Sequence, residues 1–277
     1  MADKMALKVG IIGGTGFDDP LILTDRQELN VPTPFGATSA PLINGTISGV
    51  PCVLLLRHGL KHEISPTHVP FRANIHALKS VGCTHLLATT ACGSLREEIV
   101  PGEVLVVLDQ FIDRTTKRHS TFYDGTTDIY EGVCHIPMAE PFCHHTRHIL
   151  SQSCTQLGYK FLKTGTVVTI EGPRFSTKAE SKLYQNWNCD VINMTTVPEV
   201  TLATELGMSY AALALPTDYD CWRDGTESVT VENVLKVLKV NGGKAKEVIV
   251  KSIENLKESD WLVVSENNRR KAVTSVM

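Results

Sequence analysis

The chain has 277 residues, a formal net charge of −3 and a hydrophobic fraction of 42%. This composition is typical of a soluble globular protein. The lack of a basic excess argues against a nucleic-acid partner, and no apolar run in the sequence approaches the ~20 residues that a membrane-spanning helix needs.

Eight cysteines are present without a C-x-x-C pair, and the chain starts without the charged and apolar pattern of a secretory signal. We therefore expect free thiols in a reducing compartment, the cytoplasm, with the nucleus as a second location. His144 and His148 lie four residues apart, but no carboxylate or cysteine accompanies them at zinc spacing. We interpret this pair as a solvated helix face and predict no metal site.

Continuous apolar runs predict buried strands, and a 3.6-residue periodicity predicts helices. The predicted strands lie at 8–14, 52–56, 85–91, 103–108, 165–170, 191–194 and 210–215. The predicted helices lie at 69–81, 141–157, 178–186, 198–206 and 229–253. This alternation predicts an α/β fold, a single domain over residues 1–277 with a central mixed, largely parallel sheet flanked by helices. Residues 255–277 are more polar, and we expect a tail that is partly separate from the core.

A glycine-rich loop, Gly13-Gly14-Thr15-Gly16, follows the first predicted strand. Glycines there expose backbone N–H groups that can surround a phosphate. A dinucleotide-binding loop would need a third glycine opening a helix, whereas this chain continues with an acidic pair and a proline. A loop for free phosphate, with the Thr15 hydroxyl as a donor, therefore fits better than an oxidoreductase; a plain glycine turn stays open as the alternative.

Two further strand ends carry groups that suit an anion. Arg57 and His58 follow the strand at 52–56, and Thr90 and Ala91 end the strand at 85–91. An arginine fork suits a phosphate, and a histidine can add a donor. Because ligands of open α/β sheets bind beyond the carboxyl ends of the strands, we expect these groups to share one phosphate site.

Two carboxylates, Asp218 and Asp220, stand just beyond the buried run 210–215. A carboxylate at the end of a buried strand is costly without a partner, so the pair indicates a site for a polar ligand, with at least one shifted pKa. A protonated carboxyl donates one hydrogen bond and accepts another, which matches the N7 and N6 groups of adenine. A negatively charged turn after an ordinary strand is the alternative.

Other segments are suited to the rest of a nucleoside. Phe175 follows a Gly-Pro turn and could stack on a flat ring, and Met194 and Thr195 end a strand where they could contact a sugar. One apolar helix face is formed, at i, i+3, i+4 and i+7, by Val231, Val234, Leu235 and Leu238. Packing against the sheet is the alternative for this face.

Six motifs occur in order along the chain: Gly-Gly-Thr-Gly at 13–16, Arg-His-Gly at 57–59, the cluster at 89–94, Glu-Gly-Pro-Arg-Phe-Ser at 171–176, Met-Thr-Thr-Val-Pro-Glu at 194–199 and Thr-Asp-Tyr-Asp at 217–220. Together they resemble the trimeric purine nucleoside phosphorylase superfamily, and within it the branch that cleaves 5′-methylthioadenosine. The last two motifs are specific, and the glycine-rich loop much less so.

The choice of branch rests on two positions. Relatives that take 6-oxopurine nucleosides carry glutamate in place of Ser176 and asparagine in place of Asp218. The resemblance therefore implies a pentosyltransferase of purine and methionine salvage that converts 5′-methylthioadenosine and phosphate into adenine and 5-methylthioribose 1-phosphate. A phosphorylase for 6-oxopurine nucleosides and a nucleotide sensor without turnover are the alternatives.

The resemblance also implies a role for each site residue. Phosphate would contact Thr15, Arg57, His58, Thr90, Ala91 and Thr195. The base and the ribose would contact Phe175, Ser176, Met194, Asp218 and Asp220, with Asp218 as the catalytic proton donor. The 5′-methylthio group would contact His135, Val231, Val234 and Leu235. No cofactor is implied, because inorganic phosphate is the second substrate.

The resemblance further implies a homotrimer in which each site borrows residues from a neighbouring subunit. His135 lies in a loop flanked by Gly132 and Pro137, and the end of the chain, 273–277, is apolar. We therefore expect His135 and Met277 to reach the 5′ group of a neighbouring site. Simple disorder of the tail is the alternative.

Overall fold

The computed structural model of the chain describes residues 5–17, 19–223 and 231–277, without the side chains of Val231 and Asn233. The described residues form one sheet whose strands are β1 (Val9–Gly13), β2 (Thr24–Leu29), β3 (Leu42–Ile47), β4 (Val50–Leu56), β5 (His85–Ser94), β6 (Leu105–Val107), β7 (Gln110–Arg114), β8 (Phe161–Leu162), β9 (Thr166–Ile170), β10 (Val191–Asn193) and β11 (Ser209–Asp218). The helices are α1 (Phe71–Ser80), α2 (His144–Gln156), α3 (Lys178–Asn186), α4 (Thr196–Glu205), α5 (Val231–Lys257) and α6 (Trp261–Val273), with the 3₁₀ turns η1 (Pro20–Ile22) and η2 (Pro66–His68).

The sheet branches at β5. Its main path runs β2-β3-β4-β1-β5-β10-β9-β7, and a second arm leaves β5 through β11 to β6 and β8. Strand β5 pairs in parallel with β1 and β11, and then Gly93 and Ser94 at its end pair antiparallel with β10. A Cβ atom at Gly93 would lie 3.0 Å from Ile192 and 3.2 Å from the Asp218 carboxylate, so a glycine lets both β10 and β11 approach β5 closely at this point. The branch opens the sheet where β5 and β11 end.

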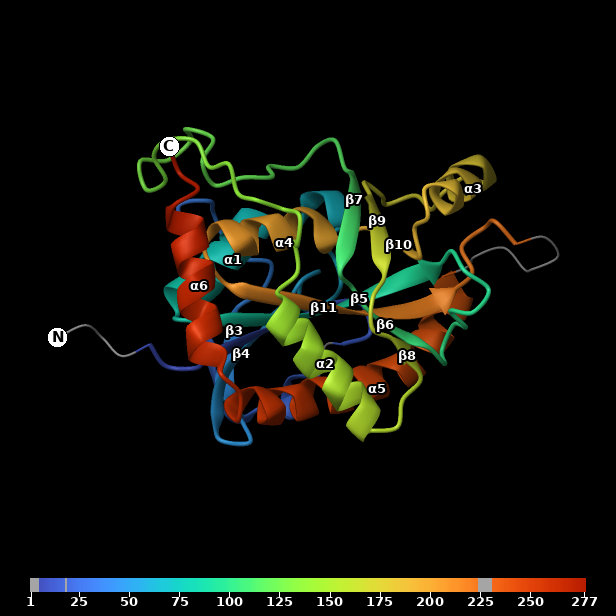
Figure 1. Ribbon diagram of the computed structural model, residues 1–277, viewed down its shortest axis with the longest axis horizontal. Helices are drawn as coiled ribbons and strands as arrows, with labels where there is room; N and C mark the ends of the chain where they lie inside the picture. Colours follow the sequence, from blue (N-terminus) through green and yellow to red (C-terminus); the bar gives the residue numbers. More distant parts are fainter. Residues whose placement is uncertain (1–4, 18, 224–230) are drawn as a thin grey trace.

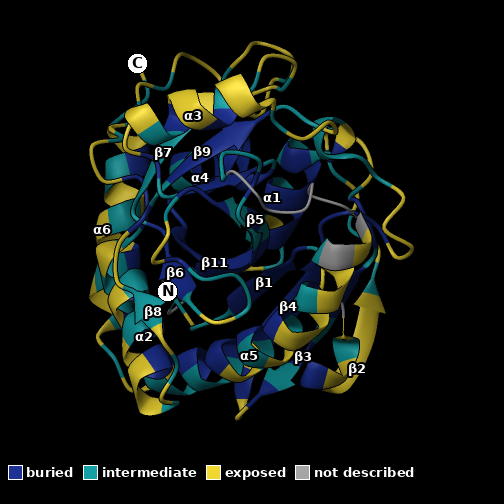
Figure 2. Cartoon of the chain, turned by 90° about the vertical axis from the view of Figure 1, so that its right-hand side faces the viewer, coloured by how far each residue is buried: buried dark blue, intermediate teal, exposed yellow. Residues whose placement is uncertain are grey.

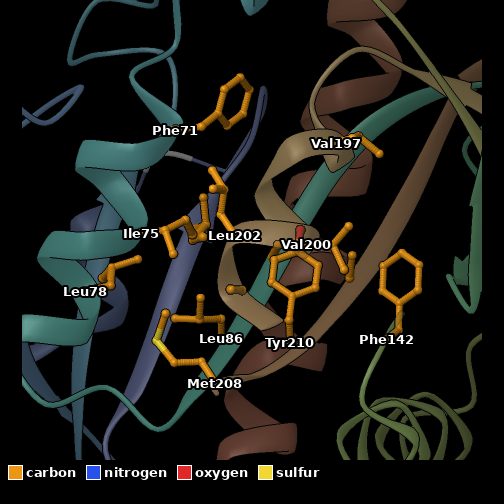
Figure 3. Packing of buried hydrophobic residues seen from close by; sticks show 14 of the residues in the cluster. Phe71, Ile75, Leu78, Leu86, Phe142, Val197, Val200, Leu202, Met208 and Tyr210 are labelled. Carbon is orange, nitrogen blue, oxygen red and sulfur yellow. The ribbon is translucent and has the colours of Figure 1, made fainter. Parts of the chain in front are cut away.

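Helices cover both faces of the sheet (Figure 1). Helices α1 and α4 lie on one face, and α2 and α5 lie on the other. Figure 3 shows the first layer, where Ile75 and Leu78 of α1 pack with Leu202 of α4 and Leu86 of β5. Full burial of such a side chain contributes about 1.5–3 kcal/mol, and the strands between the helices are buried on both faces (Figure 2).

The predicted fold class is confirmed, as is each predicted strand and helix to within a few residues. The prediction missed β2, β7 and β8, which are short, polar or at the edge of the sheet, and β3, an inner strand whose apolar residues are interrupted by Asn44 and Gly45. The expected solvated face of α2 is also confirmed, since His144 and His148 are exposed. All eight cysteines are free thiols. Within the described ranges, no helix combines the length and apolarity that crossing a bilayer would require.

The prediction that residues 255–277 are partly separate from the core was wrong. Residues 261–273 form α6, which packs against α4 and β11. Ser265 and Ala272 are buried, and Asn268 Nδ2 donates to Ser209 Oγ at 2.8 Å. The small residues on one face of α6 allow this close approach, although its average polarity is high.

Candidate functional site

A cavity of about 810 Å³ lies at the branch of the sheet, beyond the ends of β1, β4, β5, β10 and β11 and beside the first turns of α5. The structure brings most of the predicted site residues into its wall: Thr15, Arg57, His58, Thr90, Ala91, Phe175, Ser176, Met194, Thr195, Asp218, Asp220, Val234 and Leu235. It does not bring His135 or Met277 there. The side chain of Val231 lies outside the described residues.

Arg57 is 1% exposed and is held on several sides. Its Nε and Nη2 donate to the two carboxylate oxygens of Glu199 at 2.7 and 2.8 Å, and its Nη1 donates to the Thr89 carbonyl at 2.9 Å. A Cβ atom on Gly14 would come within 2.7 Å of Nη1, so the glycine-rich loop leaves the room that this side chain needs. One N–H on each terminal nitrogen stays available to a ligand, because a guanidinium carries five donors.

His58 is oriented by a backbone carbonyl. Its Nδ1 lies 2.9 Å from the Ile64 carbonyl, which can only accept, so Nδ1 carries the proton and Nε2 carries a lone pair in the neutral ring. Burial, together with the positive charge of Arg57, lowers the pKa of His58 to about 4. The expected donor therefore offers an acceptor instead, and a phosphate would have to present an O–H to it. The ring of His62 lies beside it, with centroids 4.6 Å apart.

A buried amide organises the hydroxyls at this end of the cavity. Asn193 Nδ2 donates to Thr90 Oγ1 at 2.9 Å and to Thr196 Oγ1 at 2.6 Å, and Asn193 Oδ1 accepts from Thr169 Oγ1 at 2.9 Å. Because Thr90 Oγ1 accepts from the amide, its own proton is free to point elsewhere. In the structure it is turned toward the Ala91 carbonyl, at a long 3.2 Å. Thr195 makes no side-chain hydrogen bond to cap α4, although it occupies the capping position.

The two carboxyl groups line the cavity farther along β5 from Thr90, where Asp218 of β11 pairs with Gly93. Burial raises the pKa of Asp218, and the charge of Asp220 adds to this, although hydrogen bonds from the Thr217 hydroxyl and the Asp220 amide oppose it. Both of those bonds are 2.7 Å long. Burial also raises the pKa of Asp220. The expected upward shift of the pKa is thus present in both groups.

The loop at 171–176 closes the same end. The Ser176 hydroxyl is buried and has no hydrogen-bond partner among the described residues, while its carbonyl accepts from Cys221 Sγ at 3.2 Å. Phe175 is 45% exposed at the rim of the cavity. An unpartnered buried hydroxyl is costly, and this end of the cavity therefore has hydrogen-bonding capacity that a polar ligand can satisfy.

The apolar face of α5 divides in two. Leu238 is 2% exposed and packs on the glycine-rich loop at Gly16, where the α5 residue Gly242 also leaves room for the loop backbone. Leu235, one turn earlier, lines the cavity but is 56% exposed. Packing therefore explains Leu238, whereas Val234 and Leu235 present an apolar surface with little in the described chain to cover it.

His135 and Met277 are brought to each other instead of to the cavity. The 133–135 segment and the end of the chain form an antiparallel bridge: Met277 N donates to the Val133 carbonyl at 2.9 Å, and His135 N donates to the Ser275 carbonyl at 2.8 Å. Met277 is 84% exposed. The bridge lies on the side of the molecule away from α3, the helix that follows Phe175 and Ser176 (Figure 1).

Several groups in or behind the cavity wall were not predicted from the sequence. Asn193, Glu199 and Tyr210 act through the residues that they hold, and His62 lines the cavity. A signal for Glu199 was present, because a glutamate directly between the apolar residues Pro198 and Val200 needs a partner if it is buried. No sequence pattern would have identified that partner as Arg57.

Comparisons with known proteins agree with this geometry. The family described as the Phosphorylase superfamily matches residues 8–254. The chain is 56% identical to S-methyl-5′-thioadenosine phosphorylase from Xenopus tropicalis and 54% identical to the protein of the same name from Danio rerio, in each case over 100% of this chain and 99% of the relative. The structure is similar to methylthioadenosine phosphorylase from Schistosoma mansoni in complex with adenine, with a TM-score of 0.94, 43% identity and coverage of 98% of this chain and 99% of the other. It is also similar to a variant of the Schistosoma adenosine/methylthioadenosine phosphorylase in complex with methylthioadenosine, with a TM-score of 0.93, 43% identity and the same coverage. The chain belongs to the Phosphorylase superfamily.

Proposed function

We infer that this protein is a pentosyltransferase that cleaves 5′-methylthioadenosine with inorganic phosphate and releases adenine and 5-methylthioribose 1-phosphate. The observation that carries this inference is the pair of buried carboxyls at Asp218 and Asp220, beside a free Ser176 hydroxyl, in a chain whose relatives carry this activity by name. A protonated Asp218 can donate to N7 of the base while its second oxygen accepts from the 6-amino group.

In the proposed reaction, one end of the cavity binds the departing base and the other binds the attacking phosphate. The bond from C1′ to the base breaks while Asp218 gives its proton to the departing base, and a phosphate oxygen forms the new bond to C1′ from the opposite face. We propose that Thr15, Arg57, Thr90, Ala91 and Thr195 hold this phosphate. His58 Nε2 would accept its O–H, because the ring is neutral with Nδ1 protonated. Positioning and preorganised donors supply the rate, so we propose that no metal or cofactor takes part.

We propose that the enzyme is a homotrimer and that a neighbouring subunit completes the 5′ pocket. The support is the mismatch between two surfaces: Val234 and Leu235 are an apolar wall with little cover, while His135 and Met277 form a projecting edge away from the cavity of their own chain. That edge carries exposed apolar side chains at Ile129, Val133, Val273 and Met277. An apolar edge of this kind is typical of a protein interface. We also propose a cytoplasmic location, because eight free thiols fit a reducing compartment.

The test is adenine release from 5′-methylthioadenosine with and without phosphate, with inosine as the competing substrate. We expect turnover only with phosphate, a strong preference for the 6-amino substrate, and no loss of activity after exhaustive treatment with a chelator. Release of adenine at the same rate in phosphate-free buffer would identify a hydrolase, and a preference for inosine would overturn the assignment of the base site.

A further inference from the structure

We propose that Glu199 is a positioning residue for phosphate: it holds the guanidinium of Arg57 so that the two unshared N–H groups face the anion. The inference deepens the proposed function and rests on it. It concerns a residue that does not line the cavity and would not touch either substrate.

The geometry fixes Arg57 in a single orientation. Glu199 receives two parallel hydrogen bonds from Nε and Nη2, at 2.7 and 2.8 Å, which is the bidentate arrangement that constrains a guanidinium most strongly. The Thr89 carbonyl takes one proton of Nη1 on the other side. These three bonds leave one free N–H on each terminal nitrogen, and Arg57 lines the cavity with its side chain otherwise buried.

Glu199 is itself held in place. The Tyr210 hydroxyl donates to Glu199 Oε1 at 2.7 Å, and all three side chains of this Arg57–Glu199–Tyr210 network are at most 2% exposed. Isolated burial of a carboxylate is costly, and a buried ion pair is often no more stabilising than apolar residues of the same volume. A gain in stability therefore explains a buried ion pair at this place only weakly. The need to hold two N–H donors of Arg57 toward an anion explains it specifically.

The negative charge of Glu199 makes it possible to distinguish an electrostatic role of this residue from a positioning role. Glu199 neutralises Arg57, so a purely electrostatic view predicts that removal of the negative charge leaves an unpaired cation and tightens phosphate binding. The positioning view predicts the opposite, because an amide in place of the carboxylate turns an N–H donor toward Arg57 and releases the guanidinium from its orientation. The direction of the change decides between the two.

The experiment compares Glu199→Gln with Glu205→Gln. Glu205 is a matched control: it lies on the same helix, is 4% exposed and accepts hydrogen bonds from the Thr121 hydroxyl and the Phe122 amide, away from the cavity. For each variant the KM of phosphate and of 5′-methylthioadenosine is measured, and the Kd of phosphate is obtained from the rise of Tm with phosphate concentration.

For Glu199→Gln we expect the KM and the Kd of phosphate to rise together by about 10–100-fold, as expected for the loss of charged hydrogen bonds, with the KM of the nucleoside changed by less than about threefold. For Glu205→Gln we expect a lower Tm and an unchanged Kd of phosphate. Tyr210→Phe, which removes one oxygen and keeps the ring, should raise the Kd of phosphate by about 3–10-fold.

Phosphate binding that stays the same or tightens in Glu199→Gln overturns the inference. If that variant does not fold, an unchanged Kd of phosphate in Tyr210→Phe overturns it instead. Arg57→Ala separates this outcome from failure of the proposed function: if Arg57→Ala also leaves phosphate binding unchanged, the assigned phosphate site is wrong, whereas if only Arg57→Ala weakens it, the site stands and Glu199 does not position it.

Discussion

The two ends of the cavity are built in different ways. At the end that we assign to phosphate, Arg57 and Asn193 are buried and each makes three hydrogen bonds to other parts of the chain. In the part that we assign to the base and the 5′ group, the Ser176 hydroxyl is buried without a partner among the described residues, Phe175 is 45% exposed and Leu235 is 56% exposed. At the first end the side chains are held in place by the protein and keep a few donors for a ligand, whereas the second has an unpartnered hydroxyl and apolar surface that are left for a ligand or a neighbour.

The difference corresponds to the ligand group that we propose for each end. A phosphate is small, and its position decides whether an oxygen faces C1′, so fixed donors at the strand ends are an advantage. A nucleoside is larger and partly apolar, and loops and a helix face can adjust around it. Variants at the end that we assign to phosphate should therefore change the KM of phosphate. Variants at the other end should change the preference among nucleosides.

The largest effect is expected at the base end. Asp218→Asn should lower kcat/KM for 5′-methylthioadenosine by about 10²–10⁴-fold, because an amide cannot give the departing base a proton. It should raise the activity on inosine relative to 5′-methylthioadenosine, and the double variant with Ser176→Glu should shift this ratio further. Steady-state kinetics on both nucleosides gives the ratio. Full activity of Asp218→Asn on the 6-amino substrate would exclude this residue as the proton donor.

At the phosphate end, Arg57→Ala should raise the KM of phosphate by about 100-fold, since it removes a buried charged donor pair. It also leaves the Glu199 carboxylate buried without its partner, so unfolding should become easier by about 3–5 kcal/mol. Phosphate titrations and urea unfolding measure the two effects. Arg147→Ala is the control, because this arginine donates to the Leu108 and Lys163 carbonyls outside the cavity. Equal changes in phosphate KM for both variants would contradict the assignment.

A smaller effect is expected from the end of the chain. Removal of residues 275–277 takes away Met277 and leaves α6 intact. If the tail covers the 5′ group of a neighbouring subunit, kcat/KM for 5′-methylthioadenosine should fall about 10-fold more than kcat/KM for adenosine, which matches the 1–3 kcal/mol that a small apolar group contributes. An equal loss for both substrates would argue against the cover. A monomer by sedimentation, with full activity, would defeat the shared site.

The last effect concerns the dependence of stability on pH, which has opposite signs for His58 and Asp218. His58 has a pKa of about 4 in the folded protein against an ordinary 6.5, so between these values the unfolded chain binds one more proton. Its contribution to stability is therefore lost as the pH falls from about 6.5 toward 4, by up to about 1.4 kcal/mol per pH unit. Asp218 acts in the opposite sense, because its pKa is raised above the ordinary 3.8 and the folded state keeps its proton longer.

Urea unfolding between pH 4.5 and 7, in buffer without phosphate, tests this contrast. The variant His58→Asn should show a flatter rise of stability with pH than the wild type, and Asp218→Asn a steeper one. The slope of the free energy of unfolding against pH is the quantity to compare, since either substitution can change that free energy at every pH. An unaltered slope in His58→Asn would mean that this ring is not held neutral by the fold.

The amino-acid sequence determined the parts of the protein that depend on neighbours along the chain. Apolar runs such as 52–56 and 210–215 can only be stable as buried strands, and the residues directly after them, including Arg57 and Asp218, are carried to the same edge of the sheet by the parallel pairing. The fold class, and the gathering of the glycine-rich loop, Arg57 and Asp218 around one cavity, were predictable for this reason. The polar edge strands and α6 were not, because their stability comes from packing and not from their own pattern.

Tertiary structure alone decided how these groups are used. Arg57 and Glu199 are 142 residues apart, and only the register of β4, β5 and β11 with α4 brings them to 2.7 Å. The tautomer of His58 depends on the carbonyl of Ile64, and the separation of His135 and Met277 from the cavity depends on where α6 ends. Hydrogen-bond direction and burial are properties of groups that meet in space, so the sequence could place these residues near a site but could not assign which of them donates, which accepts and which lies outside the cavity.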